Sequence, residues 1–195
     1  VGPRQPDVFP TDAPRDDRPA EFGHHDAMTS TSAPFGIEAP RFRLPAATRI
    51  GRVRLQVADL ERSLGYYTQV LGLRVGSSEG GRATLHAGDD ARVLVELHER
   101  RGAAPAPRRG AFGLYHFAVL LPTRRALGQF VDHLAQASVR FGAADHLVSE
   151  AIYLSDPDGL GIEVYRDRPR ESWRTRGHEL VMTTEALDLG ALVDD

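Results

Sequence analysis

The sequence predicts an α+β protein built from two copies of a βαβββ unit, and three observations support this fold class. From residue 49 onward, apolar residues alternate with polar ones along short stretches, as is typical of half-buried strands. Two other segments repeat apolar residues at helical spacing, each between one strand and three more. This order recurs with an offset of about 64 residues, and such repeats pack as a pair because one copy alone cannot cover its own sheet.

The first unit is predicted at residues 48–100 and opens with an alternating strand at 50–57. Asp59 follows as a candidate N-cap of a helix that ends at Gly72. Glycine turns then separate three further predicted strands, at 73–77, 83–86 and 92–97.

The second unit is predicted at residues 112–168, after a linker rich in proline, alanine and arginine. A strand at 114–121 precedes a helix that starts after Thr123. Its remaining strands are predicted at 139–142, 148–154 and 161–165. We expect residues 169–195 to form a C-terminal tail, with Trp173 as its anchor.

Residues 1–47 hold eight of the 13 prolines and show no hydrophobic period, so we expect a disordered leader. Met28 is a plausible alternative start, which would make residues 1–27 an upstream extension. The leader lacks the apolar stretch of a secretory signal. Because no apolar run approaches the roughly 20 residues of a membrane span, we expect a cytoplasmic protein.

Composition narrows the chemistry that the chain can perform. The sequence contains no cysteine and no lysine, which excludes disulfides, thiolate nucleophiles, Schiff bases and a P-loop lysine. Its formal net charge of −3 and its scattered arginines give no support for a nucleic acid or a membrane as partner. The remaining candidates for chemistry are eight histidines and the carboxylates.

Three polar residues occupy predicted strands where an apolar residue is more usual: Glu96, His116 and Glu163. A lone strand histidine is most often a structural residue with its hydrogen bonds satisfied. The repeat changes this interpretation, because His116 lies on the first strand of its unit and Glu163 on the last. If those strands pair, both side chains can enter one cup, and imidazole with carboxylate is a donor set for a divalent metal.

These residues lie within a sequence that resembles the vicinal oxygen chelate superfamily, which includes glyoxalase I, fosfomycin and bleomycin resistance proteins, and extradiol dioxygenases. The resemblance rests on residues 59–73 in the first unit and 156–165 in the second. It implies that the two units form a half-open barrel. A narrower pattern, from His146 to Glu163, is similar to the signature of type I extradiol dioxygenases; the one departure is Ala144, two residues before it.

The second unit and the residues after it are similar to the first half of the catechol-2,3-dioxygenase-like proteins of bacteria. This resemblance implies a metal-dependent oxidoreductase that cleaves catechol-type substrates with dioxygen in the catabolism of aromatic compounds. His116 and Glu163 match metal ligands, His146 matches a proton-handling histidine and Tyr153 a substrate-contacting tyrosine. The implied metal is Fe(II), with Mn(II), Zn(II) or Ni(II) as alternatives.

One position departs from this pattern, because Arg52 stands where the first unit should offer a ligand equivalent to His116. Arginine stays protonated and has no free lone pair, so it cannot bind a metal. Glu96 is a further candidate ligand, and His98 on the same strand face is the next. Arg52 could instead hold a substrate carboxylate or pair with Glu96, and in the second case no metal would bind.

The departure leaves three functions open. The chain is a ring-cleaving dioxygenase or half of one, a glyoxalase-like isomerase or lyase that uses Glu96, or a metal-free binding module of the resistance type. In the first case, a missing second half or another copy of the chain in a homo-oligomer would supply the third ligand.

Overall fold

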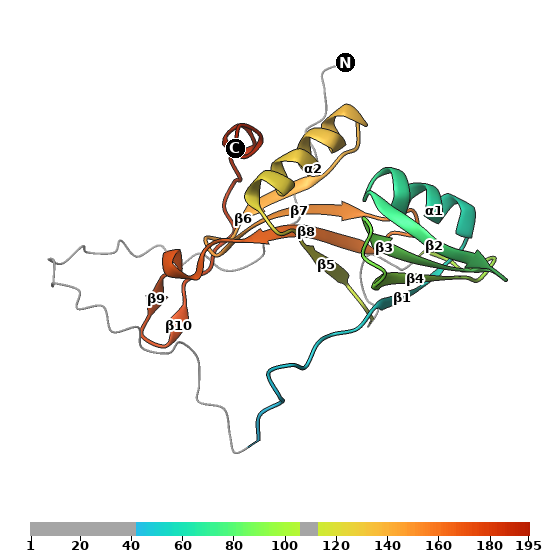
Figure 1. Ribbon diagram of the computed structural model, residues 1–195. Coiled ribbons are helices and arrows are strands. Elements are labelled where there is room, and N and C mark those ends of the chain that lie inside the picture. The colour runs from blue at the N-terminus through green and yellow to red at the C-terminus, as the bar shows by residue number, and fades with distance from the viewer. Residues whose placement is uncertain (1–41, 106–112) are drawn as a thin grey trace, which may run out of the picture.

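The computed structural model describes residues 42–105 and 113–195. Predictions for most of the leader, including Met28, and for the end of the linker between the units lie outside these ranges. Within them, the predicted order of one strand, one helix and three strands occurs twice (Figure 1). The α+β fold class with two repeated units is therefore confirmed.

The first unit comprises β1 (Val53–Val57), α1 (Leu60–Gln69), β2 (Leu73–Glu79), β3 (Arg82–Ala87) and β4 (Val93–Glu99). Its strands form one sheet in the order β1-β4-β3-β2, with β1 parallel to β4. The helix begins where predicted, because the Asp59 side chain accepts a hydrogen bond from the backbone N–H of Arg62. In β1 and β4, Leu55 and Leu97 lie in the core that α1 covers, while Arg54 and Glu96 lie on the opposite face of the sheet, called here the open face.

The second unit repeats this plan with β5 (His116–Leu120), α2 (Arg124–Gln136), β6 (Gly142–Asp145), β7 (Ser149–Ser155) and β8 (Gly161–Asp167). The sheet order is β5-β8-β7-β6, and β5 runs parallel to β8. The predicted pairing of the first strand with the last strand is thus present in both units. Figure 1 shows α1 and α2 on the same side of their sheets, so the open faces also share one side.

Two details of the predicted strands were wrong. The strand expected at 139–142 is β6, which starts only at Gly142. The residues just after α2 cap the C-terminal end of that helix and therefore do not join the strand. Ser138 adopts a left-handed conformation (φ 54°), and the Val139 N–H donates to the Leu134 carbonyl to close the helix. At the other end of the fold, Ile50 is 99% exposed, since β1 begins only at Val53, where pairing with β4 starts.

The two units share one hydrophobic core and are joined by the turn between β7 and β8. The Tyr67 ring of α1 stacks on Phe117 of β5, and its hydroxyl donates to Asp156 over 3.0 Å. In the same turn, Asp158 accepts a hydrogen bond from the backbone N–H of Ala58. The Asp-Pro-Asp-Gly motif therefore shapes a turn and also links the second unit to the first.

The residues after β8 form short elements and not only a tail. A hairpin of β9 (Thr175–Arg176) and β10 (Glu179–Leu180) is followed by α3 (Leu189–Val193), which packs on α2 (Figure 1). Leu192 of α3 is fully buried. No helix among the described residues is long and apolar enough to cross a membrane.

Candidate functional site

His116 and Glu163 meet on the open face of the second sheet. His116 starts β5, and two residues later Ala118 pairs with Glu163 on the parallel neighbour β8. The two side chains are therefore close, with 3.2 Å between His116 Nε2 and Glu163 Oε2. The His116 side chain is 37% exposed and that of Glu163 is 16% exposed, so both donors are partly accessible from the open face.

Tyr153 and His146 extend this contact into a chain of four side chains. Tyr153 lies opposite Glu163 in the pairing of β7 with β8, and its hydroxyl lies within donating distance of Glu163 Oε1, at 3.2 Å. His146 lies in the turn before β7, with its Nε2 atom 2.8 Å from the Tyr153 hydroxyl. The sequence selected all four residues, and the structure places them in the order His116, Glu163, Tyr153, His146; we call this the contact chain.

The hydrogen-bond partners of Tyr153 and His146 indicate which of their atoms carry protons. Burial and then the Glu163 carboxylate raise the pKa of Tyr153 to about 12, so the phenol keeps its proton at neutral pH. His146 Nδ1 lies 2.8 Å from the backbone carbonyl of Thr183. A carbonyl can only accept, so Nδ1 carries hydrogen and Nε2 of the neutral ring is an acceptor. The single Tyr153 hydroxyl proton then has two acceptors within reach, His146 Nε2 at 2.8 Å and Glu163 Oε1 at 3.2 Å.

The contact chain can supply part of a metal site. Two ligands at adjacent corners of an octahedron, with bonds of about 2.1 Å, lie about 3 Å apart, which is close to the 3.2 Å between His116 Nε2 and Glu163 Oε2. An imidazole and a carboxylate also suit Fe(II), Mn(II), Zn(II) and Ni(II). However, no group of three His, Asp or Glu side chains among residues 42–105 and 113–195 could hold a metal ion. The residues therefore fit two ligand positions and leave the others to groups from elsewhere.

The first unit carries a different cluster at the equivalent place. Arg54 pairs with Glu96 between β1 and β4 as Ala118 pairs with Glu163, so Arg52 corresponds to His116 and Glu96 to Glu163. Arg52 Nε lies 2.8 Å from Glu96 Oε2, and His98 Nε2 lies 2.5 Å from Glu96 Oε1. Arg54 Nη2 also reaches Glu96 Oε2, at 3.3 Å. Of the two arrangements considered for Arg52, the structure shows pairing with Glu96.

This pairing removes Glu96 from the candidate metal ligands, but it does not involve His116 or Glu163, so the donor pair of the second sheet stays available. The hydrogen bond from His98, followed by the hydrogen bond and charge of Arg54 and the charge of Arg52, holds the pKa of Glu96 below its usual range against the opposing effect of burial. Glu96 is thus an ionised carboxylate already neutralised by Arg52 and Arg54. His98 shares the strand face of Glu96 as predicted, and its ring is turned to Glu96 as well.

Sequence reasoning missed two participants. Arg54 contacts Glu96, and its position two residues after Arg52 on the same strand was a signal that could have shown it. The Thr183 carbonyl that contacts His146 belongs to the backbone of the C-terminal segment, so no side-chain pattern could have revealed it.

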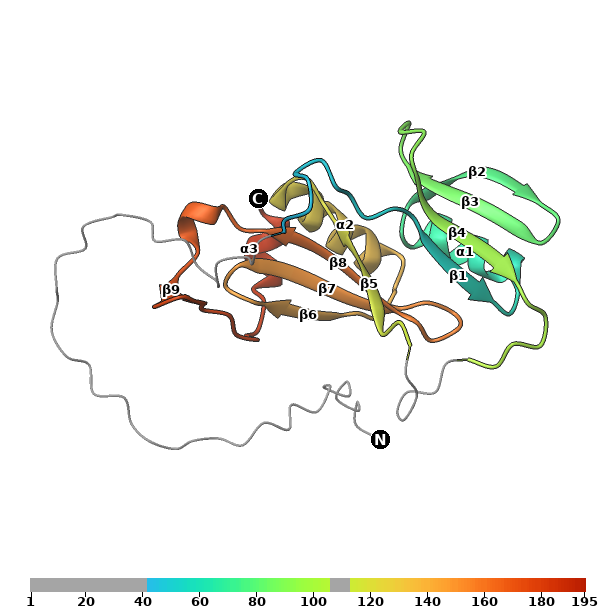
Figure 2. The same ribbon diagram turned by 90° about the horizontal axis from the view of Figure 1, so that it is seen from below.

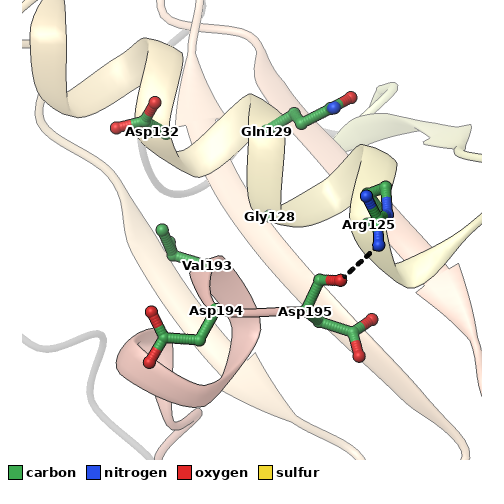
Figure 3. A pocket seen from close by; sticks show the side chains of 7 residues that line it. All are labelled: Arg125, Gly128, Gln129, Asp132, Val193, Asp194 and Asp195. Carbon is green, nitrogen blue, oxygen red and sulfur yellow. Dashed lines mark hydrogen bonds between the residues drawn. The ribbon is translucent and has the colours of Figure 1, made fainter.

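A pocket of about 340 Å³ lies between α2 and the C-terminus, away from the contact chain (Figure 3). None of the predicted site residues lines it; its lining residues are Arg125, Gly128, Gln129, Asp132, Val193, Asp194 and Asp195. Figure 3 shows Arg125 extended toward Asp195, whose backbone oxygen it contacts at 2.9 Å. The pocket marks the docking of the C-terminal helix on α2.

Comparisons with known proteins agree with this fold. Residues 49–164 match a family described as the Glyoxalase/Bleomycin resistance protein/Dioxygenase superfamily. The chain is 47% identical over 149 residues to the catechol-2,3-dioxygenase of Bacillus subtilis (strain 168), a match covering 76% of this chain and 52% of that protein. The chain thus spans about half the length of this relative.

Solved structures show the same fold at lower identity. A glyoxalase/dioxygenase from Nostoc punctiforme superposes with a TM-score of 0.54 at 17% identity, covering 70% of this chain and 100% of its own. A glyoxylase/bleomycin resistance protein/dioxygenase domain from Frankia sp. EAN1pec superposes with a TM-score of 0.52 at 21% identity, covering 62% and 98%. Both likenesses concern the fold alone.

Proposed function

The chain belongs to the glyoxalase/bleomycin resistance protein/dioxygenase superfamily, and within it we propose that the chain is a metal-dependent extradiol dioxygenase of the catechol 2,3-dioxygenase type, or the N-terminal half of one. The observation that carries the proposal is the contact chain, in which a donor pair for a metal adjoins a tyrosine and a histidine. The 47% identity to a catechol-2,3-dioxygenase supports the same choice, although only about half of that protein is covered.

His116 and Glu163 would hold the metal, with Fe(II) as our first choice and Mn(II), Zn(II) or Ni(II) as alternatives. When bound, the ion would supply positive charge for the ionised form of a catechol, and Fe(II) would also supply a redox-active centre for dioxygen, which Zn(II) would not. The remaining ligands would come from solvent, from a second half or from another copy of the chain.

The other residues of the site provide acid–base chemistry and binding. His146 Nε2 is an acceptor and takes a proton from a catechol hydroxyl. The Tyr153 phenol stays protonated and donates a hydrogen bond to the ionised substrate oxygen. Arg52 contacts Glu96 through Nε, and because its side chain is 50% exposed, its outer N–H groups can bind an anionic group of the substrate.

The partners of this function are a catechol-type aromatic compound and dioxygen, without a nucleic acid or a membrane. A homo-oligomer or a second half, a bacterial origin, a cytoplasmic location and a role in aromatic catabolism stay predictions from the sequence.

A metal-free binding role is the second candidate, and the ion pair between Arg52 and Glu96 favours it. In that role the chain would hold a small molecule on the open face without turnover. The glyoxalase-like alternative requires Glu96 as a metal ligand. The ion pairs of Glu96 with Arg52 and Arg54 argue against this alternative.

The test is ring cleavage by the full chain, purified without oxygen, loaded with Fe(II) and mixed with catechol in aerated buffer. The dioxygenase function predicts a yellow ring-fission product. Replacing His146 with Ala should lower turnover by about 10²–10⁴-fold while bound iron is retained. His133→Ala is the control, since His133 lies on α2 and contacts the Gln69 carbonyl. A chain that binds no iron and forms no product would support the metal-free role instead.

A further inference from the structure

Residues 181–187 cross beside the second sheet between β10 and α3, and we call them the C-terminal strap. The strap is fixed to β6 by a two-way backbone bridge: the Glu185 N–H donates to the Asp145 carbonyl over 2.9 Å, and the Asp145 N–H donates to the Glu185 carbonyl over 3.0 Å. Figure 2 shows this dark red segment passing the end of β6 on its way to α3. Because Asp145 directly precedes His146, the bridge fixes the strap next to the contact chain.

Two residues before the bridge, the strap touches the His146 ring. The Thr183 carbonyl oxygen lies 2.8 Å from His146 Nδ1, on the opposite side of the ring from the Tyr153 hydroxyl. The ring is therefore held between a backbone carbonyl and a phenol. Only the carbonyl constrains the ring proton, because a hydroxyl can donate as well as accept.

The other bonds around His146 fix its position but not its tautomer. The His146 N–H donates to the Ser149 carbonyl over 2.9 Å. Leu147 adopts a left-handed conformation (φ 66°), and its N–H donates to the Asp145 side chain over 2.8 Å. Arg168 holds the second carboxylate oxygen of Asp145 at 2.6 Å. These bonds place the His146 backbone, and none of them reaches the ring nitrogens.

We propose that the C-terminal strap is a positioning element of the site: the Thr183 carbonyl holds His146 in the tautomer with hydrogen on Nδ1, so that the Nε2 lone pair faces Tyr153 and the substrate. The strap thereby selects which nitrogen accepts the proton. In the proposed reaction one proton moves from a substrate hydroxyl to Nε2, which leaves an ionised substrate oxygen and an imidazolium bonded to Thr183. With the other tautomer, Nε2 would already carry hydrogen and could not accept.

This inference rests on the proposed role of His146, but its test reads the ring directly. Chains labelled with ¹⁵N-histidine, without metal or substrate, report the protonated nitrogen of each ring by NMR. We expect the wild-type His146 to be protonated at Nδ1. Glu185→Pro removes the N–H that donates to Asp145 and should shift His146 to a mixture of tautomers. Glu185→Ala changes only an exposed side chain and should leave the tautomer unchanged, as should Thr183→Ala, which keeps the carbonyl.

The same variants link the strap to turnover. With iron and catechol, kcat should fall about tenfold or more in Glu185→Pro and stay at the wild-type value in Glu185→Ala; a displaced tautomer in triad hydrolases costs about 10⁴-fold. A wild-type His146 protonated at Nε2 overturns the inference even if Glu185→Pro does not fold. Free hydrogen exchange of the Asp145 N–H in a folded Glu185→Pro chain would show that the bridge is broken. If the His146 tautomer is unchanged in that chain, the inference is also overturned. If the wild-type ring has the expected tautomer and no ring cleavage is found, the proposed function fails and the role of the strap stands.

Discussion

Arg52 and His116 occupy equivalent positions in the two units, and their charges decide what each sheet can hold. His116 with Glu163 carries a net charge of about −1 when the imidazole is neutral, which suits a divalent cation. Arg52 and Arg54 together outweigh Glu96 by one positive charge. The first unit thus places arginine side chains at the position where the second unit has the proposed metal donors.

Arg52→His should strengthen metal binding, because it exchanges a cation for a donor at the position that the family resemblance assigns to a ligand. We expect an affinity for Mn(II) at least about tenfold higher than that of the wild type, or about 1.4 kcal/mol, measured by isothermal titration. Arg74→His is the control, since Arg74 forms an exposed ion pair with Asp89. Equal affinities for all three chains would show that position 52 is out of reach of the metal.

The Glu96 cluster predicts a pH-dependent stability. The pKa of Glu96 is lower in the folded chain than in the unfolded chain. Its contribution to the free energy of unfolding is therefore present above the unfolded pKa and lost as the pH falls through the folded pKa. The difference between wild type and Glu96→Gln in urea unfolding should be largest near pH 7 and shrink below about pH 4. The exposed Glu79→Gln should show little difference at either pH.

Individual residues also show how far the sequence predicts the site. His116 and Glu163 stood out because polar residues replaced apolar ones on strands that the repeat pairs with each other, and the family resemblance added His146 and Tyr153. The Thr183 carbonyl could not be predicted, since every residue has a carbonyl and only tertiary structure selects one. The ion pair between Arg52 and Glu96 was one of two alternatives, and side-chain geometry was needed to choose between them.

Among the secondary-structure elements, the spacing of hydrophobic residues predicted α1, α2 and most strands. It did not predict the C-terminal elements β9, β10 and α3. The segment containing α3 has only five helical residues, too few for a clear period, and its burial depends on α2. The contact depends on Gly128, where an added Cβ would lie 2.3 Å from the Leu192 carbonyl oxygen. Long-range contacts of this kind leave no local pattern in the sequence.

Gly128→Ala should therefore displace α3 from α2. We expect the free energy of unfolding to fall by about 1–3 kcal/mol and the Leu192 N–H to lose protection against hydrogen exchange. Gly65→Ala in α1 is the matched control: its Cβ would meet no atom within 4 Å, so better helix propensity should stabilise the chain by up to about 1 kcal/mol. Equal stability of the two variants would contradict the close packing of α3.

At the scale of the whole molecule, the chain is a pair of units joined through Tyr67 and Asp156, and it spans about half the length of its Bacillus subtilis relative. Asp156 is buried between the units, and this burial raises the pKa of its carboxyl. The sequence predicted the pairing of units from the repeat. The hydrogen bond that joins them connects residues 89 positions apart and became visible only in the fold.

Tyr67→Phe should weaken this junction, because the Asp156 oxygen loses its buried donor. The expected loss is about 1–3 kcal/mol in the free energy of unfolding. Tyr66→Phe is a closely matched control, since the Tyr66 hydroxyl is buried and has no hydrogen-bond partner among the described residues. Tyr66→Phe should cost little or stabilise the chain, and a similar loss in both variants would contradict the role of the bond between Tyr67 and Asp156.

If His116 and Glu163 form the donor pair for a metal, the amount of iron that the chain retains depends on their side chains. Chains loaded anaerobically with Fe(II) and freed of excess ion can be assayed for bound iron by mass spectrometry. The wild type should retain about one iron per chain, Glu163→Gln should retain little, and the control Glu179→Gln, an exposed residue of β10, should match the wild type. Iron absent from the wild type, or retained unchanged in Glu163→Gln, would contradict this assignment of the metal donors.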